Sequence, residues 1–141
     1  MKIMALDVGD KTIGVAESDP LELIATGITT IERVGIRKDA DQVITLAEQH
    51  GCGRIVVGLP KNLDGSNSIQ TDKVIEFHDM LSNKIRSTKK NIEMVYHDER
   101  FTTKIAEAVL IQADLSRKKR KEVIDKQAAV VILQSYLEQN R

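Results

Sequence analysis

Three acidic positions in this sequence stand where a carboxylate is costly unless it has a partner. Asp7 follows the apolar run at 3–6, which is typical of a strand buried on both faces. Asp98 and Glu99 follow a second short apolar run, and Asp125 falls on the apolar face of a predicted helix. Three inward carboxylates that met at one point would repel one another, and a hard divalent cation, Mg²⁺ or Mn²⁺, would resolve that repulsion.

The helical face of Asp125 is defined by five apolar residues. Their spacing from Asp125 places them on the same side of a helix as Asp125. These residues are Ala128, Ala129, Ile132, Leu133 and Tyr136. A charge on such a packing face is costly unless it is paired or binds a metal. Paired metal ions about 4 Å apart activate a water and stabilise the leaving oxygen of a phosphodiester. The sequence therefore predicts metal-assisted phosphodiester hydrolysis.

Each acid also has a structural interpretation. Asp7 could bond the turn at Gly9, because aspartate before glycine is common in turns. Asp98 and Glu99 could mark a helix N-terminus, where acids favour the helix dipole. Asp125 could pair with a lysine of the basic run that precedes it.

The elements that must position these acids begin with strands and continue with alternating helices and strands. Strands are expected at 2–8, 13–17, 23–31, 54–60 and 92–97, and helices at 38–50, 68–85, 103–113 and 119–139. This order predicts an α/β fold whose mixed five-stranded sheet has an antiparallel meander of three strands, two parallel strands and helices on both faces. Right-handed crossovers would place the first strand at the centre of the sheet. Asp7 would then lie at the carboxyl end of that strand, on the edge of the sheet where ligands bind in open α/β folds.

Composition limits the alternatives. The chain has 141 residues, which suits a single domain over 1–141, and its 21 basic and 21 acidic residues balance. Two Phe, two Tyr and no Trp argue against a single-strand binder that stacks bases on aromatic side chains. Cys52 is the one cysteine, which excludes an intrachain disulfide, and His50, His78 and His97 lack zinc-site spacing. No signal peptide or membrane span is expected, so a cytoplasmic protein without a membrane partner is the default.

Four segments together carry the pattern of a known family. They are "ALDVGDKTIGVA" at 5–16, "IVVGLPKNLDGS" at 55–66, "DERFTT" at 98–103 and "IDKQAAVVILQSYL" at 124–137. In this order the chain resembles, over nearly its whole length, the YqgF/RuvX family of RNase H-like nucleases. That family is described as processing precursor 16S rRNA or resolving Holliday junctions. The resemblance implies an RNase H-like fold, a Mg²⁺ or Mn²⁺ cofactor, and Asp7, Glu99 and Asp125 as catalytic metal ligands, with Asp98 as the alternative to Glu99.

The chain departs from the family and fold pattern at two places. The family often has a Lys-Arg pair in the first turn, where this chain has Lys11 and Thr12, so one phosphate contact could be weaker. Relatives of the fold often carry their second acid at the end of the fourth strand, where "VVGLP" offers none. Glu99 is therefore expected to take that place.

Two polar segments fit a nucleic-acid substrate. In the loop "PKNLDGS", Lys61, Asn62, Ser66 and the amides near Gly65 could hold a phosphate, or the segment could be a plain loop. A run of five cations precedes Asp125 and could contact phosphates, or it could be a solvated face. Its members are Arg117, Lys118, Lys119, Arg120 and Lys121.

Two further cations complete the expected substrate contacts. Lys11 in the first turn could contact a phosphate. Arg100 could stabilise charge in the transition state or pair with Glu99.

Four functions fit these features. The favoured one is a metal-dependent endonuclease that processes the 5′ end of precursor 16S rRNA, with ribosomal particles as a further partner. A Holliday junction resolvase is the alternative, but it requires a symmetric dimer. The sequence has no long apolar stripe that would form a dimer interface, so a monomer or a weak homodimer is expected. A non-catalytic RNA-binding module ranks lower, as does an actin-like ATPase, which would need a second domain. The sequence leaves RNA and DNA both open as substrate.

Overall fold

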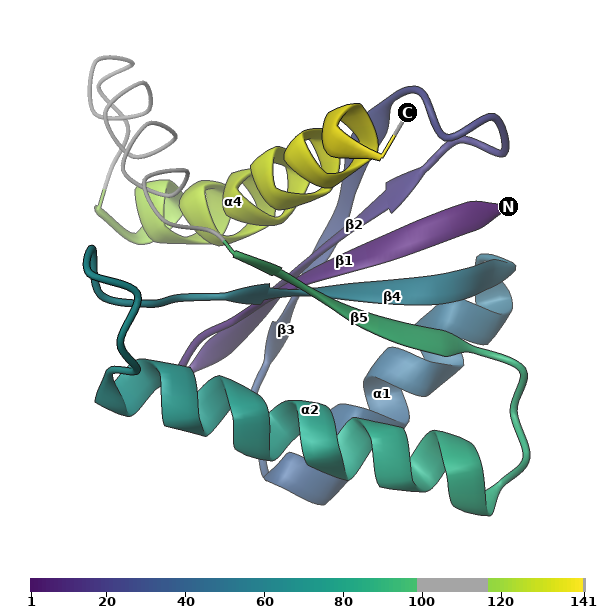
Figure 1. Ribbon diagram of the computed structural model, residues 1–141, viewed down its shortest axis with the longest axis horizontal. Coiled ribbons are helices and arrows are strands. Elements are labelled where there is room, and N and C mark those ends of the chain that lie inside the picture. The colour runs from purple at the N-terminus through teal and green to yellow at the C-terminus, as the bar shows by residue number, and fades with distance from the viewer. Residues whose placement is uncertain (99–116, 141) are drawn as a thin grey trace.

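The centre of the molecule is a mixed five-stranded sheet, which Figure 1 shows in the computed structural model. The structure describes residues 1–98 and 117–140, with the side chains of the last helix from Gln127 onward. The strands are β1 (Lys2–Val8), β2 (Thr12–Ser18), β3 (Ala25–Glu32), β4 (Cys52–Leu59) and β5 (Glu93–Asp98). Their order is β3-β2-β1-β4-β5. β2 is antiparallel to both β1 and β3, whereas β4 runs parallel to β1 and β5 parallel to β4, which confirms the predicted sheet with β1 at its centre.

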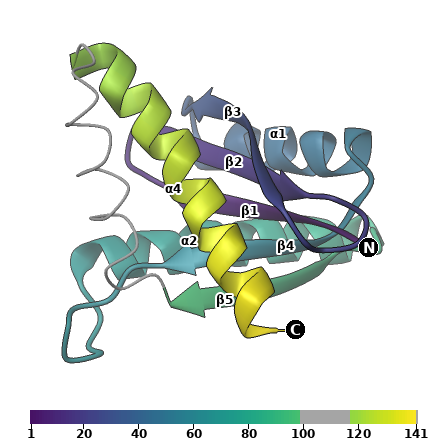
Figure 2. The ribbon, with the colours of Figure 1, turned by 90° about the horizontal axis from the view of Figure 1, so that it is seen from above.

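Helices cover both faces of this sheet. α1 (Ile36–Gln49) and α2 (Ile69–Ser87) lie on one face, and α4 (Arg117–Gln139) crosses the other, as Figures 1 and 2 show. The helix expected at 103–113 lies outside the described residues. None of the helices in the described ranges is long and apolar enough to cross a lipid bilayer.

Alternation along β1 divides its side chains between two cores. Met4 and Leu6 are fully buried in the core that includes α1 and α2. Ile3 and Ala5 are fully buried in the core that α4 closes. Since successive residues of a strand point to opposite faces, Asp7 belongs to the face of α4.

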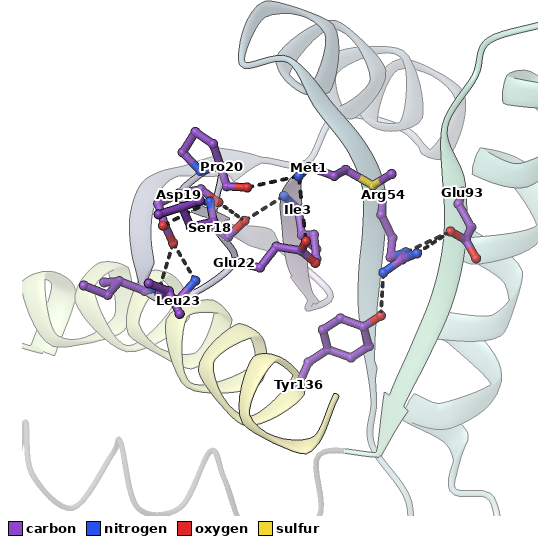
Figure 3. Close-up of polar contacts among 12 residues, drawn as sticks. Met1, Ile3, Ser18, Asp19, Pro20, Glu22, Leu23, Arg54, Glu93 and Tyr136 are labelled. Atoms are coloured by element: carbon purple, nitrogen blue, oxygen red, sulfur yellow. Dashed lines mark hydrogen bonds and ion pairs between the residues drawn. The ribbon is translucent and has the colours of Figure 1, made fainter. Parts of the chain in front are cut away.

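The loop between β2 and β3 explains why β3 begins two residues later than predicted. The carboxylate of Asp19 accepts hydrogen bonds from the amides of Leu23 at 2.7 Å and Ile24 at 2.8 Å, so these amides serve the loop (Figure 3). Gln134 of α4 then accepts from the amide of Ala25 at 3.0 Å and donates to the carbonyl of Leu23 at 3.1 Å. The same end of the sheet holds a polar contact of Tyr136, whose hydroxyl accepts from Arg54 at 3.1 Å.

Candidate active site

Asp7 lies half-buried near the carboxyl end of the central strand, with a glycine on each neighbouring strand. Gly14 of β2 is its antiparallel partner. On the other side Leu6 pairs with Val57 of β4, so Gly58 follows at the level of Asp7. The residue directly opposite Asp7 is therefore a glycine on both neighbouring strands. Glycine at both positions leaves space beside Asp7 that a larger residue would fill.

The face of α4 that packs on the sheet is the predicted one. Ala129, Ile132 and Leu133 are fully buried in one cluster with Ala5 and Val56. Asp125 lies one helical turn before Ala129 on the same stripe of the helix backbone. Figures 1 and 2 show the amino-terminal end of α4 on the side of the sheet where β4 and β5 end. The topology thus brings the Asp125 position toward the edge that carries Asp7, although the side chain of Asp125 lies outside the described residues.

The second predicted ligand comes after β5. Tyr96 stacks on His78 of α2 with ring centroids 4.1 Å apart, whereas Nε2 of His97 lies 3.0 Å from the hydroxyl of Ser135 on α4. By alternation Asp98 shares the α2 side with Tyr96, on the opposite face from Asp7. This placement speaks against Asp98 as the partner of Asp7. Glu99, the remaining candidate, lies outside the described residues.

The turn after Asp7 is held by a buried ion pair that the sequence analysis missed. The amide of Gly9 donates to the carbonyl of Thr12 at 2.8 Å, and a Cβ at Gly9 would lie only 2.9 Å from that oxygen. Arg33 donates from Nη1 to the carbonyl of Gly9 at 2.9 Å and from its amide to the carbonyl of Lys11 at 2.9 Å. Its Nε also donates to Asp39 at 2.9 Å. The turn that follows Asp7, with exposed Lys11 on it, is thus tied to the end of β3 and the start of α1.

Asp39 completes this network from inside the protein. Its side chain is only 1% exposed, and its second oxygen accepts from the amide of Val34 at 3.0 Å. Burial would raise the pKa of Asp39, but the hydrogen bonds from Val34 and Arg33 outweigh it and lower the pKa below its ordinary value of 3.8. The guanidinium of Arg33 also lies 5.2 Å from the ring centroid of Phe77 in α2. Elements α1 and α2 therefore both brace the turn.

The loop after β4, which could hold a phosphate or be a plain loop, is closed by hydrogen bonds among its own residues. The amide of Gly65 donates to the carbonyl of Asn62 at 2.8 Å, and Nδ2 of Asn62 donates to the hydroxyl of Ser66 at 3.0 Å. The amide and hydroxyl of Ser66 both donate to the carboxylate of Asp64, at 2.9 Å and 2.6 Å. In the structure without substrate, these polar groups thus bond to one another within the loop. Lys61 is half-buried at its start.

The other predicted contacts fall on parts that the structure describes incompletely. Arg100 lies outside the described residues, and the run of five cations forms the first residues of α4, where only the backbone is described.

The histidines and the cysteine of the described residues do not gather into a zinc site. Nδ1 of His50 is 2.8 Å from the carboxylate of Glu17, and burial lowers the pKa of His78 and of His97. Cys52 is buried, and burial raises its pKa to about 11, so it offers no thiolate at neutral pH. Within the described ranges no three His, Cys, Asp or Glu side chains gather around one point. A three-carboxylate set therefore depends on Glu99 and Asp125 joining Asp7, and carboxylate oxygens are the donors that Mg²⁺ and Mn²⁺ prefer.

The family model and the relatives described next match this chain over nearly its whole length. The model of a family described as "RuvX: Holliday junction resolvase" matches residues 1–139. A protein of Natranaerobius thermophilus named "Putative pre-16S rRNA nuclease" is 46% identical over 140 residues, which covers 98% of this chain and 94% of that protein. A protein of the same name in Desulforamulus reducens is 49% identical over 138 residues, covering 98% and 97%.

Solved structures share the fold at low identity. The structure titled "T. thermophilus RuvC in complex with Holliday junction substrate" has a TM-score of 0.60 at 9% identity, covering 99% of this chain and 95% of that one. The fowlpox virus Holliday junction resolvase also has a TM-score of 0.60, at 15% identity and with full coverage of both chains. These likenesses confirm the RNase H-like fold predicted from the sequence.

Proposed function

Because this chain belongs to the RuvX family, we propose that it is a divalent-metal-dependent endonuclease that processes the 5′ end of precursor 16S rRNA. The observation that carries this proposal is the position of Asp7, half-buried on the central strand between Gly14 and Gly58 and facing α4. The relatives in Natranaerobius and Desulforamulus support the choice of substrate through their names.

The proposed site divides its work among a few residues. Asp7, Glu99 and Asp125 would hold Mg²⁺ or Mn²⁺, which when bound supplies an activated water and stabilises the leaving oxygen. Arg33 keeps the turn after Asp7 in place through its bond to the carbonyl of Gly9. Exposed Lys11 on that turn would contact a phosphate of the substrate.

Three other predicted residues keep a substrate-binding role in this proposal. Lys61 and Asn62 lie at the start of the loop after β4, on the edge where that strand ends. Arg100 would stabilise charge on the phosphate in the transition state.

Cleavage of two substrates side by side tests this function. Labelled precursor 16S rRNA and a labelled four-way DNA junction are incubated with the protein and Mg²⁺ or Mn²⁺. We expect the precursor to be cut near its 5′ end and faster than the junction, with no cleavage in EDTA. Symmetric nicking of the junction beside intact precursor rRNA would reverse this order. Cleavage that persists in EDTA would exclude the metal.

The alternative function is junction resolution, which the description of the family itself favours. Two coordinated cuts across a symmetric junction need two copies of the site in a symmetric dimer. The mass of the free protein in solution therefore separates the functions further, because a monomer is sufficient for processing one RNA end.

The basic run at the start of α4 leads to a prediction about salt. Replacing Lys118 and Lys119 by glutamine should weaken binding of precursor rRNA. It should also reduce the slope of log Kd against log salt concentration by about 1 to 2, because each lost phosphate contact lowers that slope by nearly 1. The matched control replaces Lys89 and Lys90 by glutamine, a pair that follows α2 at the opposite edge of the sheet. Binding titrations at several KCl concentrations measure both slopes. Equal slopes for the two variants would show that the run is a solvated face.

A further inference from the structure

The pairing of β1 with β4 leaves one carbonyl group beside Asp7 without its regular partner. The pairs end at Leu6. Backbone groups of successive residues point alternately to the two neighbouring strands, and since the amide of Gly9 donates to β2, those of Val8 point to β4. One further step of the ladder would need the amide of residue 60 to donate to the carbonyl of Val8. Residue 60 is Pro60, which has no N–H, so the ladder offers no donor there.

Gln70 of α2 supplies the donor that the ladder lacks. Its Nε2 donates to the carbonyl of Val8 at 3.1 Å, in a half-buried position. Figure 1 shows the amino-terminal end of α2 at the edge of the sheet where β1 ends. The carbonyl of the next residue, Gly9, accepts from Arg33 at 2.9 Å. The two carbonyls that directly follow Asp7 are thus each held by a side chain from another element.

The first turn of α2 is anchored, so Gln70 extends from a fixed base. The hydroxyl of Ser68 accepts from the amide of Thr71 at 3.2 Å, and the amide of Ser68 donates to the hydroxyl of Thr71 at 2.9 Å, which caps the helix. The Thr71 hydroxyl in turn donates to the carbonyl of Pro60. Thr71 is fully buried. The start of α2 is therefore tied to the end of β4.

Gln70 acts on Asp7 through the backbone of β1. It belongs to α2, which packs on one face of the sheet, whereas Asp7 faces α4 on the other. A further contact of α2 with the first turn, from Lys73 to Asp10 at 3.1 Å, is exposed and holds the turn only weakly. The half-buried bond of Gln70 is the stronger of these two links between α2 and the end of β1.

We propose that Gln70 is a positioning residue for Asp7, which keeps the carboxylate in the geometry that a bound Mg²⁺ or Mn²⁺ requires. The inference rests on the proposed function, because that function makes Asp7 a metal ligand. A side chain at the end of a strand moves with the peptide that follows it. Outer hydrogen bonds that hold a metal ligand in place are typically worth about 10- to 100-fold in metal affinity or activity.

Replacing Gln70 by methionine tests this role, because methionine is unbranched and of similar length but has no N–H donor. With precursor rRNA and saturating Mn²⁺, kcat should fall by about tenfold, the lower end because the bond acts through the backbone, while KM for the RNA should stay within about twofold. The Mn²⁺-induced rise in Tm, measured without RNA, should also become smaller. A merely structural residue would lower Tm in EDTA and leave kcat and the metal response unchanged.

The matched control is Gln134→Met. Nε2 of Gln134 also donates to a backbone carbonyl at 3.1 Å, that of Leu23, and Oε1 of Gln134 accepts from the amide of Ala25 at 3.0 Å. These bonds lie at the start of β3, on the opposite edge of the sheet from Asp7. Gln134→Met should lower Tm in EDTA at least as much as Gln70→Met, but it should keep both kcat and the Mn²⁺ response.

The outcomes distinguish a failure of this inference from a failure of the proposed function. Equal kcat for the wild type and Gln70→Met, or an equal loss of kcat in Gln134→Met, would overturn the positioning role while the nuclease proposal stands. A folded wild-type protein that neither cuts RNA nor gains stability from Mn²⁺ would overturn the nuclease proposal, and the positioning role would fail with it.

Discussion

Replacing Asp7 by asparagine is expected to abolish cleavage, by a thousandfold or more on an order-of-magnitude estimate, while the fold stays as stable as before or gains stability. Asparagine has the shape of aspartate but lacks the charge, so it removes a proposed metal ligand. Without metal it also relieves the cost of a half-buried carboxylate beside the two further acids that we propose as its partners. Melting curves with and without Mn²⁺ should show a smaller metal-induced rise in Tm for the variant.

The matched control for this change is Asp10→Asn. Asp10 lies three residues further on in the same turn, its side chain is 61% exposed, and it pairs with Lys73 at 3.1 Å. It should keep both the cleavage rate and the Mn²⁺-induced rise in Tm. A folded Asp7→Asn protein that still cuts RNA and still gains stability from Mn²⁺ would mean that Asp7 only bonds the turn.

Removing the carboxylate of Asp39 is expected to cost about 3 kcal/mol of the free energy of unfolding, the lower end for a buried pair, because it leaves the partly buried Arg33 guanidinium without its counter-charge. The loss is a large share of the roughly 5–15 kcal/mol that stabilises a domain. Asp39→Ala also deprives the amide of Val34 of its acceptor. Urea unfolding followed by circular dichroism measures the loss, and a decrease below about 1 kcal/mol would show that the pair contributes little.

Asp41→Ala provides the comparison on the same helix. Asp41 is 63% exposed and pairs with Lys84 at 2.9 Å, so its loss should cost less than about 1 kcal/mol. The buried pair also gives a pH signature. The pKa of Asp39 is lowered in the folded protein, so its contribution is complete above its unfolded pKa near 3.8 and decreases as pH falls below that value. Acid should therefore reduce the difference in stability between wild type and Asp39→Ala.

Local patterns were sufficient to predict most of the fold. The two-sided apolar run predicted β1 with the bounds Lys2–Val8 that the structure has, and helical spacing predicted the buried stripe of Ala129, Ile132 and Leu133. A predicted strand boundary was wrong where a side chain accepts hydrogen bonds from backbone amides. Asp19 binds the amides of Leu23 and Ile24, which delays β3.

The candidate site was predictable only in its charged members. The choice of Asp7 as a candidate followed from its unusual place in an apolar run, but its glycine neighbours depend on the register of β2 and β4, which no local pattern fixes. The pair of Arg33 and Asp39 joins residues six apart between the end of β3 and the start of α1, and no motif or period in the sequence marks the two as partners. The closure of the β4–α2 loop had a local signal, because aspartate two residues before serine favours a bond to that backbone amide.

The central place of β1 determines how long Asp7 keeps its surroundings. A strand paired on both sides can expose its amides to deuterated solvent only when the sheet itself opens, so the segment around Asp7 belongs to the slowest-exchanging part of the protein. The loop at 62–66 lies outside the sheet and is closed by bonds such as that from the amide of Gly65 to the carbonyl of Asn62 at 2.8 Å, so its amides should exchange sooner. On heating, this loop should therefore open before the strand that carries Asp7.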